Sequence, residues 1–190
     1  PAEPMVKKEE WKGIAVYVQM DGNRIHPVTL ELIGKAKELA SVIQAPVYCL
    51  LIGSRVKEKA EELQYYGIER VFLYDHPGLA DFNIMTYANV FSDFIENVRP
   101  SSILVGATSE GRSLAPRGAA RFRTGLTADC TVLEMKDNSD LVQIRPAFGG
   151  NIMAQIVTPR HRPQFCTVRY KVFSQAERNR FPGGSIEQME

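Results

Sequence analysis

The sequence has few of the features that define a metal centre, a disulfide scaffold or a membrane span. Its three cysteines have no CxxC spacing and lie in or beside apolar runs, so we expect buried thiols in a reducing compartment. The histidines are scattered, with no HxxxH or His/Cys cluster and no Ser-His-Asp arrangement, so we predict neither a metal site nor a catalytic residue. No apolar stretch reaches the roughly 18 residues of a membrane span, and the first ten residues lack the apolar region of a signal peptide. We therefore predict a cytoplasmic protein without membrane insertion.

The sequence also lacks a large net charge. The 190 residues carry a formal charge of +1, which gives no general reason to expect nucleic acid as a partner. Arginines are nevertheless gathered in the helix predicted over 112–122, and basic residues exceed acidic ones in 141–190. Such regions suit an acidic protein surface or a phosphate-bearing cofactor, although a solvated helix face has the same composition. An interaction module with an arginine-rich face is therefore one hypothesis.

Apolar runs typical of strands alternate with amphipathic helical stretches as far as residue 122. In chain order, the strand-like and helical segments are 14–18, 29–43, 47–52, 56–66, 71–74, 83–98, 103–105 and 112–122. Continuously apolar strands separated by helices are typical of a parallel sheet that is covered on both faces. We therefore predict a doubly wound α/β domain with a mostly parallel sheet.

After residue 122 the pattern changes to short strands separated by turns. Strand-like runs cover 126–135, 141–148, 152–157 and 164–173, and we expect them to complete the sheet as an antiparallel extension. The two ends of the chain are polar and carry prolines or glycines. We predict a tether over residues 1–11, one domain over 12–173 and a linker over 174–190.

The junction around Gly106 is the point about which we expect the domain to be organised. An apolar strand ends there, a turn of small residues follows, and helical spacing resumes at Arg112. In an open α/β sheet such a junction lies at the carboxyl edge, where helix N-termini favour anions and ligands usually bind. The turn matches neither GxGxxG nor the Walker pattern. The residues alone leave two interpretations, a nucleotide or flavin edge and an ordinary capped turn.

Two longer motifs give a more specific indication. The segments 106–131 and RPAFGGNIMAQIVTPRHRP at 145–163 resemble the alpha subunit of electron transfer flavoproteins, and the resemblance extends from about Trp11 to Phe173. It implies the N-terminal domain of that subunit, with an adenine nucleotide alpha hydrolase-like fold. Such a domain pairs with the beta subunit and supports FAD-mediated electron transfer from dehydrogenases, or electron bifurcation in an NADH-linked complex. The resemblance thus implies an electron carrier subunit and not an enzyme.

The family's second domain, which holds FAD through a Ser-Gly and Gln-His segment, has no counterpart after Phe173. We therefore expect a chain that ends at the linker to that domain and that holds no tightly bound FAD of its own.

The resemblance also implies which residues face a flavin. Arg145 begins the RPAFGGN loop and would approach the isoalloxazine held mainly by the beta subunit, where its charge would favour an anionic reduced flavin. A surface arginine in a strand-edge pair is the alternative. Phe148, Gly149 and Asn151 would let the backbone come close to a flavin or partner, or they would form a plain hairpin turn.

Thr124 and Thr127 lie in the next loop and strand entry after the helix over 112–122. Their hydroxyls would either hydrogen-bond a cofactor or cap the turn. The competing hypothesis from another class is an adenine-nucleotide-binding domain, stress-protein-like or ATP-pyrophosphatase-like, that uses the turn over 106–111. Protection against heat by ATP would favour that hypothesis.

Overall fold

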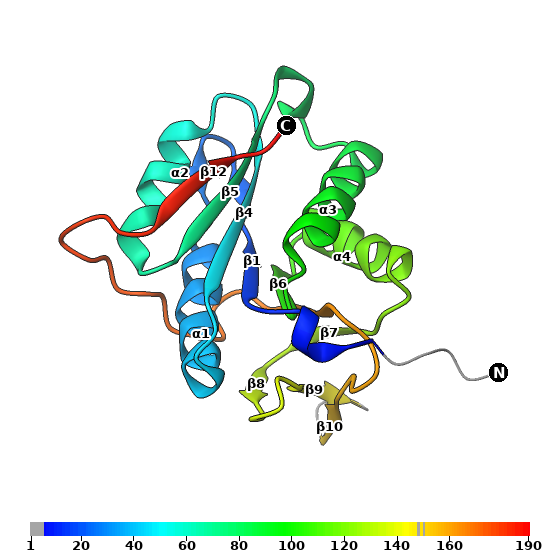
Figure 1. Cartoon of the computed structure of the whole chain (residues 1–190). Coiled ribbons are helices and arrows are strands. Elements are labelled where there is room, and N and C mark those ends of the chain that lie inside the picture. The colour runs from blue at the N-terminus through cyan, green and yellow to red at the C-terminus, as the bar shows by residue number, and fades with distance from the viewer. Residues whose placement is uncertain (1–5, 148, 150) are drawn as a thin grey trace.

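A computed structural model of the chain describes residues 6–147, 149 and 151–190 (Figure 1). Its centre is a seven-stranded sheet in which every neighbouring pair of strands is parallel. Across the sheet the order is β12 (Ser185–Gln188), β5 (Arg70–Asp75), β4 (Val47–Gly53), β1 (Ile14–Tyr17), β6 (Ser102–Gly106), β11 (Gln164–Val168) and β7 (Leu126–Cys130). The predicted α/β class with a mostly parallel sheet is confirmed.

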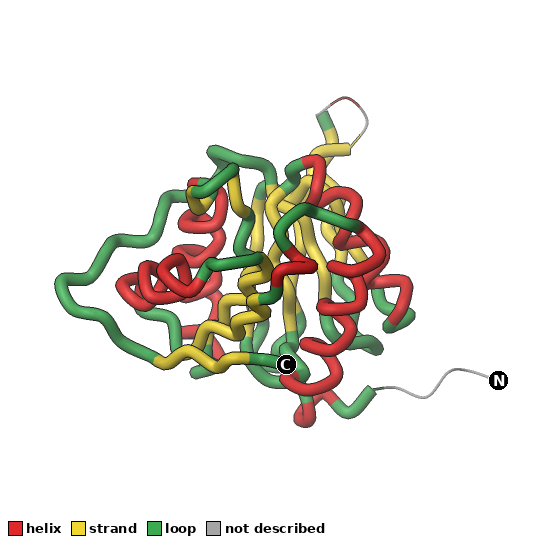
Figure 2. The backbone as a smooth tube through the Cα atoms, turned by 90° about the horizontal axis from the view of Figure 1, so that it is seen from above, coloured by secondary structure: helices red, strands yellow, loops and turns green. Residues whose placement is uncertain are grey.

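Helices cover both faces of this sheet, as Figure 2 shows with red helices flanking the yellow strands. One face carries α1 (Pro27–Ile43) and α2 (Lys57–Leu63), and the other carries α3 (Ile84–Val98) and α4 (Ser109–Arg121). Short 3-10 helices lie before β1 at η1 (Lys8–Glu10), after α2 at η2 (Gln64–Tyr66) and after β5 at η3 (Pro77–Leu79). All four residues of β1 are buried because alternate side chains point into the two different cores. Burial on both faces explains why the strands are continuous apolar runs in the sequence.

The region after residue 122 differs from the prediction in one respect. An antiparallel extension is present, but it is a separate sheet of β8 (Val132–Met135), β9 (Leu141–Ala147) and β10 (Ile152–Ile156), at the lower end of the molecule in Figure 1. The runs that become β7 and β11 join the main sheet in parallel instead. The segment 131–163, which includes the small sheet, is the crossover that permits this, because it brings the chain back to begin β11 beside the start of β6.

Both ends of the described chain pack against the domain. The Val6 N–H donates to the carbonyl of Arg160 and the Arg99 guanidinium lies 5.7 Å from the Trp11 ring centroid, so residues 6–11 lie on the body. Within 174–190, predicted as a linker, the Ala176 N–H donates to the Leu30 carbonyl and residues 185–188 form β12 beside β5. This strand was not predicted, because it is short, mostly exposed and without an apolar period.

The three cysteines are free and buried, as predicted. A hairpin of β2 (Met20–Asp21) and β3 (Arg24–Ile25) follows β1. Among the residues that the structure describes, no helix is long and apolar enough to cross a membrane.

Candidate functional site

A cavity of about 290 Å³ lies at the carboxyl edge of the main sheet. The chain leaves β1 through α1 to reach β4 on one side, whereas it leaves β5 through α3 to reach β6 on the other side of β1. The order of strands therefore reverses between β1 and β6, and ligands of open α/β sheets bind at this kind of switch point. The ends of β1 and β4, the β2–β3 hairpin, residues 80–82 and the start of α4 line the cavity.

Gln19, two residues after β1, bridges the crevice beside this cavity. Its Nε2 donates to Glu110 Oε2 at 2.8 Å, and its Oε1 accepts a hydrogen bond from Thr108 Oγ1 at 2.7 Å. Thr108 also caps α4, because its Oγ1 accepts from the Gly111 N–H at 3.1 Å. Gly111 has to be glycine, since a Cβ there would overlap the carbonyl oxygen of Gly106. The predicted junction is thus a capped helix start with a carboxylate in its first turn.

The cavity is acidic. Glu110 and Asp81 line it, and none of its lining residues is a lysine or an arginine. Burial, followed by the charge of Glu110, raises the pKa of Tyr17 well above its ordinary value. Burial, followed by the charges of Glu110 and Asp81, raises the pKa of Tyr87 to about 12. A phosphate here would face two carboxylates and no cation, so this geometry disfavours the adenine-nucleotide hypothesis.

The residues predicted to face a flavin lie elsewhere, and none of those described lines the cavity. Arg145 is half-buried on β9, opposite Ala154 of β10. No residue in the described part of the chain forms a hydrogen bond or ion pair with its side chain. Its guanidinium is therefore available to a group outside this domain.

The turn after β9 continues this exposed region. Gly149 has a φ of 76°, and a Cβ there would have no neighbour within 4 Å among the described atoms, while Asn151 is exposed. Phe148 lies outside the described residues. Ile152 and Met153 follow on β10 and are 55% and 50% exposed, which is unusual for side chains of this size. We call this region the hairpin surface, consisting of Arg145, Gly149, Asn151, Ile152, Met153 and Ile156.

Thr124 and Thr127 have protein partners for both of their hydroxyls. Thr124 Oγ1 donates to the carbonyl of Pro163 at 2.8 Å. Thr127 is buried, and its hydroxyl donates to Gln143 Oε1, whose amide Nε2 donates to the Phe165 carbonyl at 3.1 Å. Both hydroxyls thus bond distant segments of the chain, and neither contact is the turn cap that the sequence offered as the alternative. A cofactor role for the two threonines stays a prediction.

Sequence reasoning missed a buried ion cluster near the start of β9. Arg162, whose side chain is fully buried, and Lys8 both donate to Asp140 Oδ1 at 2.7 Å. Burial alone would raise the pKa of Asp140, but the hydrogen bonds from Lys8 and Arg162 outweigh it and lower that pKa. The three residues are far apart in the sequence, and no periodic spacing relates them. The sequence does not single out Arg162 either, because it lies beside Arg160 and His161 in the polar stretch 158–164.

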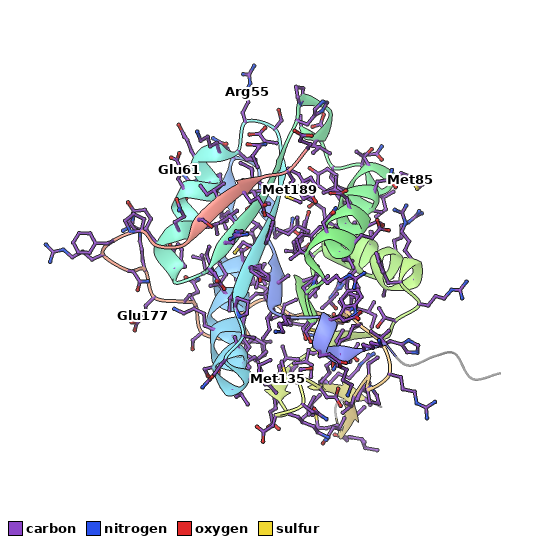
Figure 3. All side chains as sticks on the ribbon, viewed as in Figure 1. Arg55, Glu61, Met85, Met135, Glu177 and Met189 are labelled. Carbon is purple, nitrogen blue, oxygen red and sulfur yellow. The ribbon has the colours of Figure 1, made fainter. Side chains whose placement is uncertain are left out.

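Gln19 was also missed, because one polar residue after a strand has no distinctive pattern. The arginines of α4 have neighbours on the adjacent helix: Arg121 Nη1 donates to Asn89 Oδ1 at 2.9 Å, and Arg117 Nη1 contacts the sulfur of Met85, labelled in Figure 3. These contacts agree with a solvated helix face. Among the described residues, no group of three or more His, Cys, Asp or Glu side chains could hold a metal ion.

Known proteins resemble this chain over almost its whole length. The model of the electron transfer flavoprotein domain matches residues 14–190. The lactate dehydrogenase (NAD(+),ferredoxin) subunit LctC of Acetobacterium woodii is 66% identical over 185 residues, which are 97% of this chain and 44% of that protein. The electron transfer flavoprotein subunit alpha of Megasphaera elsdenii is 44% identical over 178 residues, 93% of this chain and 53% of that subunit. The chain thus spans about half the length of the curated relatives it matches.

Proposed function

Because this chain belongs to the electron transfer flavoprotein family, we propose that it is the N-terminal domain of an alpha-type subunit. In this proposal it pairs with a beta subunit, completes one wall of the FAD site held mainly by that subunit, and supports electron transfer from a dehydrogenase. It acts as an electron carrier subunit in the cytoplasm and has no catalytic residue of its own. Residues 174–190 lead toward a second, FAD-binding domain.

The name of the Acetobacterium woodii relative includes lactate dehydrogenase, NAD(+) and ferredoxin. It supports the narrower proposal that the parent complex bifurcates electrons between two acceptors. Which dehydrogenase supplies the electrons depends on the partner chains.

The observation that carries the proposal is the hairpin surface. Ile152 and Ile156 lie on one face of β10 and are 55% and 36% exposed, and Arg145, which is opposite Ala154 between them, has a guanidinium that no described residue pairs. Apolar side chains exposed as a group are typical of protein contact surfaces. A guanidinium at the border of such a contact can hydrogen-bond an anionic flavin without changing its own protonation. A beta subunit that covers the hairpin would bring its flavin to both features.

The acidic cavity supports the same proposal by a separate argument. Its carboxylates and the cap by Thr108 leave the usual phosphate position of this fold unfavourable for an anion. A flavin with a pyrophosphate is therefore better held outside this domain, by the partner and by the second domain.

The test places a charge on the hairpin surface. Ile152→Asp should weaken binding of a beta subunit at least about tenfold, because a carboxylate would be desolvated in the contact. The matched control is Val42→Asp, which alters an aliphatic residue of similar exposure, 49%, on α1. Calorimetric titration of the beta subunit measures both affinities, and thermal melts check folding. Equal affinities of the two variants would contradict the assigned surface, and an unaltered chain that binds no beta subunit would contradict the proposed function itself.

A further inference from the structure

We propose that the acidic cavity at the switch point binds a primary ammonium group, carried by a lysine side chain of a partner chain or by a small free amine. This inference does not rest on the proposed function, because it concerns a site that the flavin would not use.

The first argument is the placement of Glu110. Gln19 holds only its Oε2, at 2.8 Å, and no described residue hydrogen-bonds its Oε1. The carboxylate lies in the first turn of α4, where the helix N-terminus stabilises a negative charge. Asp81 lines the same cavity and is exposed. The cavity therefore offers a fixed carboxylate with a free oxygen and a second acid at its rim.

The second, independent argument is Tyr17. Its side chain is only 2% exposed and lines the cavity, with its ring centroid 5.4 Å from that of Phe91. Its hydroxyl has no hydrogen-bond partner among the described residues. Among the described residues it is not one of the fully buried unpaired polar atoms, so it is accessible from the cavity and can pair with a ligand there. Because burial and Glu110 raise the pKa of Tyr17, the phenol stays neutral and its oxygen can accept from an ammonium group.

The rest of the lining selects among cations. Phe82 and Tyr87 meet edge to face, with centroids 5.0 Å apart, and both line the cavity. Aromatic walls favour organic cations. Magnesium and calcium need about six or more oxygen ligands, and no described group of three or more acidic, histidine or cysteine side chains is present to supply them. A volume of about 290 Å³ admits an aminobutyl arm, which is the length of a lysine side chain.

The direct test titrates the isotopically labelled chain with 1,4-diaminobutane and follows its backbone amides by NMR. Saturable shifts are expected at Gly22, Gly53 and Glu110, which line the cavity. Neutral 1,4-butanediol and the anion AMP should leave these amides unchanged. An equal response to the diol, or saturable shifts with AMP, would overturn the proposal.

Variants separate this site from general binding to acidic surfaces. Glu110→Gln keeps an acceptor for Gln19 but removes the charge, and should weaken diamine binding about tenfold or more. Tyr17→Phe removes only the hydroxyl and should weaken it severalfold. Glu61→Gln, on the exposed side of α2 (Figure 3), is the matched control and should have no effect. If Glu110→Gln does not fold, Tyr17→Phe decides. Unchanged affinity in a folded Glu110→Gln or Tyr17→Phe variant would overturn the proposal.

The source of the ammonium group is decided in the heterodimer. If a lysine of the beta subunit occupies the cavity, adding that subunit should reproduce the same shifts and exclude the diamine. If a free amine is the ligand, the diamine should bind the heterodimer as well as the isolated chain. If neither the isolated chain nor the heterodimer binds the diamine, the ammonium site is contradicted. Heterodimer formation, which tests the proposed function, does not depend on that result.

Discussion

Arg145 is the single residue that most directly tests the proposed flavin contact. In the complete alpha–beta complex, Arg145→Ala should make the potential of the beta-held flavin more negative by tens of millivolts. The reason is that a hydrogen bond to a charged group contributes about 1.5 to 3 kcal/mol, here to the anionic reduced form. In the Arg145→Lys complex the flavin potential should lie between those of the unaltered and Arg145→Ala complexes. Lysine keeps the positive charge but lacks the planar guanidinium with its paired donors.

Potentiometric titration measures these potentials. Arg160→Ala, which alters an exposed arginine in the connection after β10, serves as the control. Unchanged flavin potentials in a well-folded Arg145→Ala complex would show that Arg145 does not contact the flavin.

Among the elements, the small sheet is fixed to the body by Asp140. This carboxylate pairs with Lys8 of η1 and with Arg162 in the connection before β11, so three segments meet at one buried group. Because its pKa is lowered in the folded state, the folded protein binds fewer protons than the unfolded one below about pH 4. The stabilisation is therefore complete above the ordinary aspartate pKa of about 3.9 and is lost as the pH falls through the lowered value.

Asp140→Asn should lower the free energy of unfolding by about 3 kcal/mol or more near neutral pH, because Arg162 stays buried without its counter-charge. The difference from the unaltered chain should shrink in acid. Urea denaturation at neutral pH and at about pH 3 measures both effects. The control is Asp137→Asn, in the exposed part of the same turn. Equal losses in the two variants would contradict the role of the cluster.

The same elements show what the sequence could and could not predict. The helices and the first four parallel strands follow from apolar patterns within each segment, and the predicted boundaries lie close to the observed ones. The parallel direction of β11 is set by how the chain returns from β10, and a fully buried strand has the same composition in either direction. The pairing of Asp140 with Arg162 and the bridge by Gln19 are contacts between distant segments, so no local spacing indicates them. The motif around Arg145 did identify an exposed hairpin.

At the scale of the whole molecule, the proposal gives the described surface one wall of a flavin site. We therefore expect the purified chain to contain no stoichiometric FAD, because its cavity is acidic and its hairpin surface is open on one side. Visible absorption and a protein assay on the native preparation measure the ratio, and the heterodimer with a beta subunit is the positive control. A yellow preparation of the chain alone, with about one flavin per chain, would contradict this expectation.

The strand order also governs how this molecule is made. β11 lies between β6 and β7, although the ribosome synthesises it after both. In the main sheet as described, β11 is the only neighbour of β7, and β12 covers the outer edge of β5. During translation β7 therefore has no place in this sheet until residues 164–168 have emerged, and β5 keeps an open edge until residues 185–188 follow. Open strand edges favour pairing with other chains. The nascent chain thus keeps open strand edges in this sheet until residues 185–188 have emerged.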